Sequence, residues 1–504
     1  MKKILTIILD GLGMKEDIYG NAVKNAGMTN LIELWNNYPH CLLRASGKGI
    51  GLPEDQCSCS ELGHEVIGTG REIKNRLSEI NKVFRNENLK YNKKYGEMIE
   101  YLKEHDKNLH IIILLSDGGV SSHIDHLGLF LKEIKKEKIN NNIYIHAITD
   151  GKDTGKHKSY QYIKQIDGLL SNQVKLATIC GRYYALDETK NYKKTEMYYN
   201  LLFNGKGIDA KNIPTTIKKC YERNLSDEYL PPLKTNEYIP IENKDVVFLM
   251  NYSKENQEQL VNAIDGKDFI EFDQTTKVKL YSIYEIDSNL NKNYFYKTEA
   301  YTKTFLECLS GLEVSQAHIY ESIKKYSMEY YIYGERFVKL DNCNKYCINT
   351  DSSRNYDYKP EMNSLNIAKA AINCMEEDID FVLVNFANPD IIGHTGNYQG
   401  TINSLQAVDL CIGKMVDFAK ENFYKVIITS SHANADTIIN RNNEVVPENT
   451  NAPVPLIITD EKIELKNGTL TSFAPTILKY MDIAIPKEMK ETEILISQKT
   501  SSKK

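Results

Sequence analysis

Apolar residues in this chain gather in short continuous runs, and polar or helix-like segments lie between these runs. Continuous apolar runs are typical of strands that are covered on both faces of a sheet. Helical periodicity between the runs, as in Ser364–Met375 and Ile402–Ala419, indicates an α/β fold with parallel sheets flanked by helices. We predict buried strands at seven places: Ile4–Leu9, Ile111–Leu115, Ile143–Ile148, Val246–Met250, Phe381–Val384, Val426–Ile428 and Val454–Ile458.

Polar residues suited to catalysis follow several of the predicted strands directly. The clearest cases are Asp10, Asp117, Asp150, Asp390 and His432. In open α/β sheets, ligands bind at the carboxyl ends of the strands. We therefore expect a site that is built from strand-end loops.

Carboxylate and imidazole groups recur among these strand-end residues. Asp390 and His394 are four residues apart, and Asp10 and His432 follow other strands. Carboxylates and imidazoles are ligands of divalent metals. A single Asp or His at a strand end is more often a cap or a hydrogen-bonding residue, but several such groups in one chain favour a metal site.

Ser60 is a candidate nucleophile in a segment that ends with two glycines, Gly68 and Gly70. A serine at a helix N-terminus beside a metal can be ionised and attack a phosphate. The same segment also fits a helix with an N-cap serine that ends at these glycines. The segment by itself leaves both interpretations open.

Length, charge and cysteine content narrow the class of protein. A chain of 504 residues is too long for one compact domain. The net charge of −5 offers no general attraction for nucleic acid, and no apolar stretch has the length of a membrane helix. Ten cysteines without a CxxC pair indicate free thiols in a reducing cytosol, so we predict a cytoplasmic protein.

Six short motifs are informative when they are taken together in chain order. They are Ile8-Leu9-Asp10-Gly11-Leu12-Gly13, Ser60-Glu61-Leu62-Gly63-His64, Asp150-Gly151-Lys152-Asp153, Gly181-Arg182-Tyr183-Tyr184-Ala185, Asn385-Phe386-Ala387-Asn388-Pro389-Asp390 and Pro453-Val454-Pro455-Leu456. With these motifs the chain resembles the cofactor-independent (2,3-bisphosphoglycerate-independent) phosphoglycerate mutases of the alkaline phosphatase superfamily.

This resemblance implies an alkaline-phosphatase-like, doubly wound sheet domain formed by residues 1–76 and 297–504, with a second α/β domain, residues 77–296, inserted for substrate binding. It implies a monomer with a small phosphorylated substrate and two Mn²⁺ or Mg²⁺ ions. In the family, a serine takes the phosphate of 3-phosphoglycerate and returns it to the 2-position. The implied residues are Ser60 as nucleophile; Asp390 and His394 for one metal; Asp10, Ser60 and His432 for the other; and Lys152, Asp153 and Arg182 for the substrate.

Several positions depart from the family's pattern. Ser431 replaces an aspartate and Asn449 a histidine, which removes one ligand from each implied metal. On the substrate side the replacements are Ser121 for a histidine, Glu188, Ser253 and Asn256 for arginines, Ser352 for a lysine, and Lys152 for an arginine. Each charge-assisted contact contributes on the order of 1.5–3 kcal/mol, so these losses predict weaker binding of phosphoglycerate by roughly 6 kcal/mol or more.

Three functions remain open on this sequence. The first is a divergent family member that has lost mutase activity and serves as a binding or regulatory protein. The second is an active phosphoryl-transfer enzyme that acts on another phosphate ester, with Ser60 and the surviving ligands. The third is a working phosphoglycerate mutase of glycolysis with unusual ligands.

Overall fold

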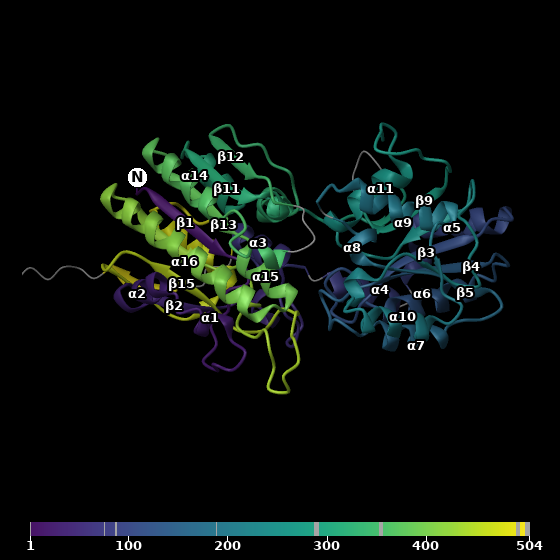
Figure 1. Cartoon of the computed structure of the whole chain (residues 1–504). Helices are drawn as coiled ribbons and strands as arrows, with labels where there is room; N and C mark the ends of the chain where they lie inside the picture. The colour runs from purple at the N-terminus through teal and green to yellow at the C-terminus, as the bar shows by residue number, and fades with distance from the viewer. Residues whose placement is uncertain are drawn as a thin grey trace, which may run out of the picture. The chain divides into compact units, whose positions relative to one another are not determined.

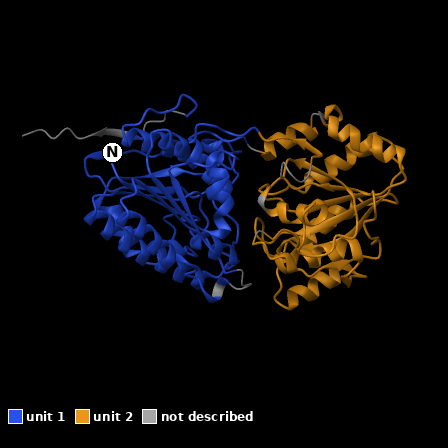
Figure 2. Cartoon of the chain, turned by 90° about the horizontal axis from the view of Figure 1, so that it is seen from above, with its two compact units in different colours: residues 1–74, 299–504 blue, residues 75–298 orange. Residues whose placement is uncertain are grey.

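A computed structural model describes residues 2–74, 76–85, 88–187, 189–286, 292–351, 356–489 and 494–498. The chain forms two compact units, residues 1–74 with 299–504 and residues 75–298 (Figure 2). Each unit contains an eight-stranded sheet with helices packed on both faces (Figure 1). No helix in the described ranges is long and apolar enough to cross a membrane.

The sheet of the first unit has the strand order β12-β11-β13-β1-β14-β15-β2-β17. The strand β1 lies near its centre and pairs in parallel with β13 and β14. The strands are β1 Ile4–Leu9, β2 His40–Arg44, β11 Gln316–Glu321, β12 Cys343–Ile348, β13 Phe381–Phe386, β14 Lys425–Thr429, β15 Val454–Ile458 and β17 Gly468–Thr469. A small separate pair joins β16 Ile463–Leu465 to β18 Leu495–Gln498.

Strand β1 shows why the apolar runs are continuous. Ile4 and Ile8 point into a core that contains side chains of α3, α12 and α17, whereas Leu5 and Ile7 point into the opposite core with α2, α14 and α16. Both faces are thus buried, as expected of a covered parallel sheet. The helices are α1 Ala22–Asn25, α2 Thr29–Asn37, α3 Ser60–Thr69, α12 Phe305–Ser310, α13 Lys325–Glu329, α14 Ser364–Glu376, α15 Asn388–Thr395, α16 Tyr398–Glu421 and α17 Phe473–Tyr480.

The sheet of the second unit has the order β10-β9-β8-β3-β4-β5-β7-β6. Its strands are β3 Leu109–Leu115, β4 Ile143–Thr149, β5 Val174–Gly181, β6 Ile208–Asp209, β7 Leu233–Lys234, β8 Val246–Leu249, β9 Lys279–Tyr284 and β10 Tyr294–Tyr296. The run from β8 to β5 is parallel throughout, so the carboxyl ends of these four strands share one edge.

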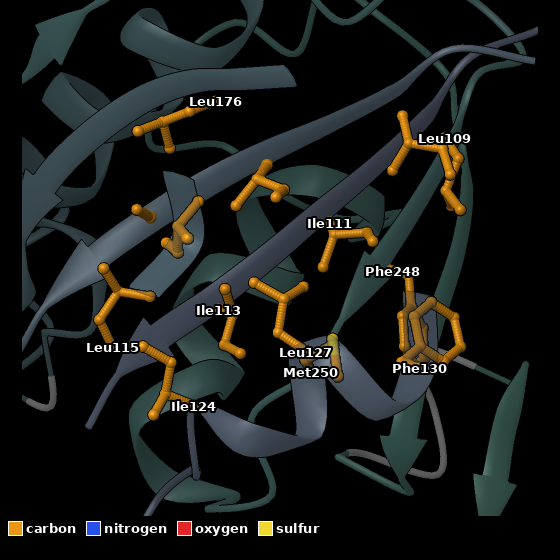
Figure 3. Packing of buried hydrophobic residues seen from close by; sticks show 14 of the residues in the cluster. Leu109, Ile111, Ile113, Leu115, Ile124, Leu127, Phe130, Leu176, Phe248 and Met250 are labelled. Carbon is orange, nitrogen blue, oxygen red and sulfur yellow. The ribbon is translucent and has the colours of Figure 1, made fainter. Parts of the chain in front are cut away.

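Helices cover both faces of this second sheet as well. Ile111 and Ile113 of β3 pack with Leu127 and Phe130 of α6 (Figure 3), whereas Ile112 joins the opposite core with α9 and α11. The helices are α4 Arg76–Arg85, α5 Lys93–Glu104, α6 Asp125–Lys136, α7 Ser159–Asp167, α8 Arg182–Ala185, α9 Tyr192–Asn204, α10 Ile213–Glu222 and α11 Glu255–Asp265.

The predicted apolar runs all correspond to strands, with ends that differ by a few residues. One expectation needs correction, because the sheets are not wholly parallel. Strand β15 runs antiparallel to both β14 and β2, and β7 runs antiparallel to β5. The apolar run Val454–Ile458 carries no information on strand direction, since a buried strand looks the same in either sense.

Candidate active site and metal centre

Ser60 is the first residue of α3, and its side chain is almost fully buried. Its Oγ donates a hydrogen bond to Asp10 Oδ2 at 2.9 Å and accepts one from Lys324 Nζ at 3.0 Å. Ser327 Oγ lies 3.0 Å from the same atom. The helix N-terminus favours negative charge at this position. The hydroxyl is therefore held between a carboxylate and an ammonium, which suits a nucleophile that attacks an anionic ester.

Two glycines allow the backbones around Ser60 to approach closely. A Cβ on Gly63 would lie 2.1 Å from the carbonyl oxygen of Ser431, so α3 rests directly on the loop after β14. Gly11 has a φ of 80°, and a Cβ there would lie 2.8 Å from the Cα of Asp390. These contacts bring the ends of β1, β13 and β14 together at Ser60.

Lys324 lies three residues after the end of β11 and is buried among the acidic residues of the site. Its Nζ is 2.5 Å from Asp390 Oδ2 and 3.1 Å from Asp10 Oδ2. Burial alone would lower the pKa of this amine, but the charges of Asp390 and Asp10 raise it above its ordinary value. Lys324 is thus a permanent cation in contact with the nucleophile and two carboxylates.

Asp390, His394 and His432 form a cluster whose ligand atoms lie within 4.8 Å of one another. Asp390 and His394 are on one face of α15, and His432 follows β14. Both imidazole Nε2 atoms face Asp390 Oδ1, His394 at 3.1 Å and His432 at 2.8 Å. The chemistry of this donor set, one carboxylate oxygen and two imidazole nitrogens, fits a divalent transition metal.

The other ring nitrogens determine the tautomers of the two histidines. His394 Nδ1 donates to the carbonyl oxygen of Pro447 at 2.6 Å. Ser431 Oγ donates to Asp10 Oδ1 at 2.6 Å, so it accepts from His432 Nδ1 at 2.9 Å. When Nδ1 carries the hydrogen, Nε2 is the ring nitrogen that can bind a metal ion. The partners of Nδ1 resemble those that orient metal-binding histidines elsewhere.

The electrostatics of the two aspartates agree with this interpretation. Burial would raise the pKa of Asp390, but Lys324, His432 and His394 hold it well below the ordinary value. The pKa of Asp10 is likewise lowered, because His64 and Lys324 outweigh the effect of burial. Both side chains are therefore carboxylates that can bind a cation.

The two replaced metal positions lie in this region but not in the cluster. Ser431 serves as the hydrogen-bonding link between His432 and Asp10. Asn449 Oδ1 accepts from Asn434 Nδ2 at 3.4 Å, and this amide also donates to the carbonyl oxygen of Pro447. Nearby Asp436 is bonded to Thr450 at 2.7 Å and does not join the cluster.

The second unit holds its predicted substrate residues at the shared strand edge. Arg182 NH1 donates to Asp150 Oδ1 at 2.6 Å and to Asp153 Oδ2 at 2.8 Å. Burial and the neighbouring Asp153 raise the pKa of Asp150, which Arg182 only partly offsets. Lys152 lies in the same loop, with its backbone N–H bonded to Asp150 Oδ1. The charge of Arg182 is thus already balanced by two carboxylic groups.

The resemblance implies cations at several positions, and those that lie within the described residues carry neutral side chains. Asn256 Nδ2 donates to Ser121 Oγ at 3.0 Å, and Ser253, three residues earlier in the chain, is also buried. The oxygens Asp150 Oδ2 and Asn256 Oδ1 are buried without a hydrogen-bond partner in the described part of the chain. Positions Glu188 and Ser352 lie outside the described residues.

Sequence reasoning missed Lys324, Ser327 and the role of His64. His64 Nδ1 donates to the carbonyl oxygen of Ser60 at 2.7 Å, and burial lowers the pKa of its ring. Lys324 is placed by β11, whose sequence contains Gln, His, Tyr and Glu and therefore lacks the apolar signal of a buried strand. Its position three residues after a strand end was the one available signal.

Comparisons with known proteins agree with the geometry. A family model described as the BPG-independent PGAM N-terminus matches residues 80–288, and one described as type I phosphodiesterase / nucleotide pyrophosphatase matches residues 269–476. The 2,3-bisphosphoglycerate-independent phosphoglycerate mutase of Gracilaria tenuistipitata var. liui is 34% identical and covers 98% of both chains. That of Campylobacter jejuni subsp. doylei is 32% identical over 97% of this chain and 99% of the relative.

A solved structure of Leishmania mexicana phosphoglycerate mutase at low cobalt concentration superposes with a TM-score of 0.92. It shares 23% sequence identity and covers 98% of each chain. At this identity the likeness concerns the fold, and it confirms the expected α/β fold class. The residue roles at the site rest on the geometry given above.

Proposed function

We propose, from the premise that this chain belongs to the family of 2,3-bisphosphoglycerate-independent phosphoglycerate mutases, that it transfers phosphoryl groups through Ser60 and prefers an ester less anionic than phosphoglycerate. The observation that carries the proposal is the placement of Ser60 Oγ between Asp10 Oδ2 and Lys324 Nζ, beside the Asp390, His394 and His432 cluster. A nucleophile so placed is retained in full, which argues against a protein that only binds.

The residues of the first unit have distinct roles in this reaction. Ser60 Oγ attacks phosphorus, an Oγ–P bond forms, and the ester P–O bond breaks as the alcohol leaves. The hydroxyl proton leaves along the hydrogen bond to Asp10. Lys324 stabilises the negative charge on Ser60 Oγ and on the phosphoryl oxygens. A divalent ion bound by Asp390, His394 and His432 would supply Lewis-acid polarisation of a phosphoryl oxygen; Mn²⁺ and Mg²⁺ are the ions that the family resemblance implies.

The recognition side supports a substrate with less charge. Phosphoglycerate carries a carboxylate as well as a phosphate, and its tight binding needs several cations. In the second unit Arg182 is shared by Asp150 and Asp153, and the amide of Asn256 bonds to the hydroxyl of Ser121. Hydroxyls, amides and unpaired acceptor oxygens suit an alcohol or polyol portion better than a second anion.

Detection of phosphoserine tests the proposal directly. The purified protein is incubated with Mn²⁺ and either 3-phosphoglycerate or an uncharged-alcohol ester such as glycerol phosphate, and the Ser60 peptide is examined by mass spectrometry. Ser60→Ala should abolish labelling. Ser58→Ala is the matched control, because Ser58 is buried two residues earlier and its Oγ donates to the carbonyl oxygen of Cys59 at 3.4 Å.

The expected result is a phosphorylated Ser60 with glycerol phosphate and little conversion of 3-phosphoglycerate to 2-phosphoglycerate in a coupled assay. Turnover of 3-phosphoglycerate at a rate typical of enzymes, abolished in Ser60→Ala, would instead identify a working mutase. An unlabelled Ser60 with every ester would contradict phosphoryl transfer and favour a binding protein.

A further inference from the structure

The two carboxylates of the first unit differ in what surrounds them. Asp390 Oδ1 faces the Nε2 atoms of His394 and His432, whereas both oxygens of Asp10 accept hydrogen bonds from hydroxyl groups. We infer that this chain binds one divalent ion, at Asp390, His394 and His432, and that the ammonium of Lys324 takes the place beside Asp10 that a second ion would need. This differs from the two ions that the family resemblance implies, and it concerns binding only, so it stands apart from the proposed reaction.

The contacts of Asp10 leave no set of donors for a metal. Oδ1 accepts from Ser431 Oγ at 2.6 Å, and Oδ2 accepts from Ser60 Oγ at 2.9 Å. Lys324 Nζ lies 3.1 Å from Oδ2 and has no lone pair to offer a metal. His64 Nε2 is 3.7 Å from Oδ1 and accepts from Asn385 Nδ2 at 3.3 Å.

Within the described residues, Asp390, His394 and His432 are the only group of three His, Cys, Asp or Glu side chains whose ligand atoms converge. His432 belongs to this cluster through Nε2 and is tied to Asp10 only through Ser431, on its Nδ1 side. One imidazole therefore cannot serve a second ion beside Asp10 while it serves the first. Ser431 is a positioning residue that orients His432, in a place where a carboxylate would have been a ligand.

The charges beside Asp10 also favour a single bound divalent ion. Lys324 Nζ contacts the carboxyl groups of both Asp10 and Asp390. A divalent ion on Asp10 Oδ2 would lie next to this ammonium in a buried region, where like charges repel strongly. The ammonium already neutralises the carboxylate that such an ion would bind.

Metal content and electron paramagnetic resonance test the inference without an activity assay. The full-length protein is loaded with Mn²⁺, desalted and analysed for bound metal per chain, and its spectrum distinguishes an isolated ion from a spin-coupled pair. We expect one Mn²⁺ per chain with the spectrum of an isolated ion. His394→Ala should lose this ion, whereas His40→Ala, which changes an exposed histidine of the same unit, should keep it.

A gain-of-binding variant tests the role of Lys324. The double variant Ser431→Asp with Lys324→Gln supplies a carboxylate next to Asp10 and removes the ammonium, so bound Mn²⁺ should rise from one to two per chain with a spin-coupled spectrum. Circular dichroism and thermal unfolding establish that each variant is folded. Two ions in the unchanged protein, an ion retained in His394→Ala, or one ion in the folded double variant would each overturn the inference.

Discussion

Replacing Gly63 by alanine should disturb the active site through one added methyl group. Gly63 lies in the middle of α3, in ordinary helical conformation, so the change introduces no backbone strain of its own. Its Cβ would lie 2.1 Å from the carbonyl oxygen and 2.6 Å from the carbonyl carbon of Ser431. Because both are backbone atoms, α3 and the loop after β14 have to separate by about 1 Å or more to reach ordinary contact distance.

This separation has a cost in stability and a larger one in function. Inserting a methyl group into a packed backbone contact destabilises by about 1–3 kcal/mol. Ser60 lies one turn before Gly63, and its hydrogen bond to Asp10 together with that of Ser431 spans the same gap. A displacement of about 1 Å at reacting atoms lowers rates by roughly 100-fold. Phosphorylation of Ser60 should therefore slow by about two orders of magnitude.

Gly96→Ala is the control for the helical substitution itself. Gly96 is an exposed glycine of α5, and a Cβ there meets nothing within 4 Å. Alanine should stabilise this helix by up to about 1 kcal/mol. Urea unfolding gives the stability of each variant, and the rate of Ser60 phosphorylation gives the function. A Gly63→Ala protein with unchanged unfolding midpoint and unchanged rate would refute the reasoning, since the contact would then not constrain the site.

Three further changes have expected outcomes. Burial lowers the pKa of His318 to about 3, so its imidazole stays neutral in the folded protein at pH 5. In the unfolded chain the imidazole takes up a proton below about pH 6.5. As the pH falls from about 8 to 5, the free energy of unfolding should therefore decrease by about 2 kcal/mol because of His318. His318→Gln should remove this pH dependence in urea unfolding, and an unchanged dependence would contradict the assignment. Asn397 caps α16, since its Oδ1 accepts from the backbone N–H of Gly400 at 2.9 Å. Asn397→Ala should therefore destabilise the folded protein by about 1 kcal/mol in urea unfolding. An unchanged unfolding midpoint would argue against the cap. Ser431→Ala should weaken Mn²⁺ binding about 10- to 100-fold in calorimetric titration, because His432 loses the partner that orients it; equal affinity would argue against that role.

The sequence predicted those parts of the molecule that leave a local signal. Strand β1 was located to the residue, because both of its faces are buried and every position except Thr6 is apolar. Asp390 and His394 were recognised from their spacing, and the structure places them on one face of α15. Ser60 was expected at a helix N-terminus and begins α3 there.

Features that depend on tertiary contacts left no such signal. Strand β11 is buried although half of its residues are polar, because His318 and Gln316 bond to each other and Glu321 bonds to Asn363. Because this strand was not predicted, Lys324, which lies three residues after it, was not recognised as a site residue. Sequence reasoning also interpreted Ser431 as a lost metal ligand, and the structure shows that its hydroxyl links His432 to Asp10 through hydrogen bonds. A hydrogen bond between residues far apart in the chain is decided by packing rather than by local pattern.

Formal charges connect the proposed substrate preference with the inferred metal count. Asp10, Asp390 and Lys324 together leave one negative charge in excess, which a single divalent ion converts to one positive charge. A second ion would leave three positive charges, a field suited to a more anionic ester. In the second unit Arg182 is already balanced by Asp150 and Asp153. Glycerol phosphate and phosphoglycerate differ mainly by a carboxylate, so the ratio of their kcat/KM values should favour glycerol phosphate in the unchanged protein. In the variant Ser431→Asp with Lys324→Gln, three carboxylates and two divalent ions again leave one positive charge, so the ratio should still favour glycerol phosphate. A ratio that favours phosphoglycerate in either protein would show that charge at this centre does not govern the choice of ester.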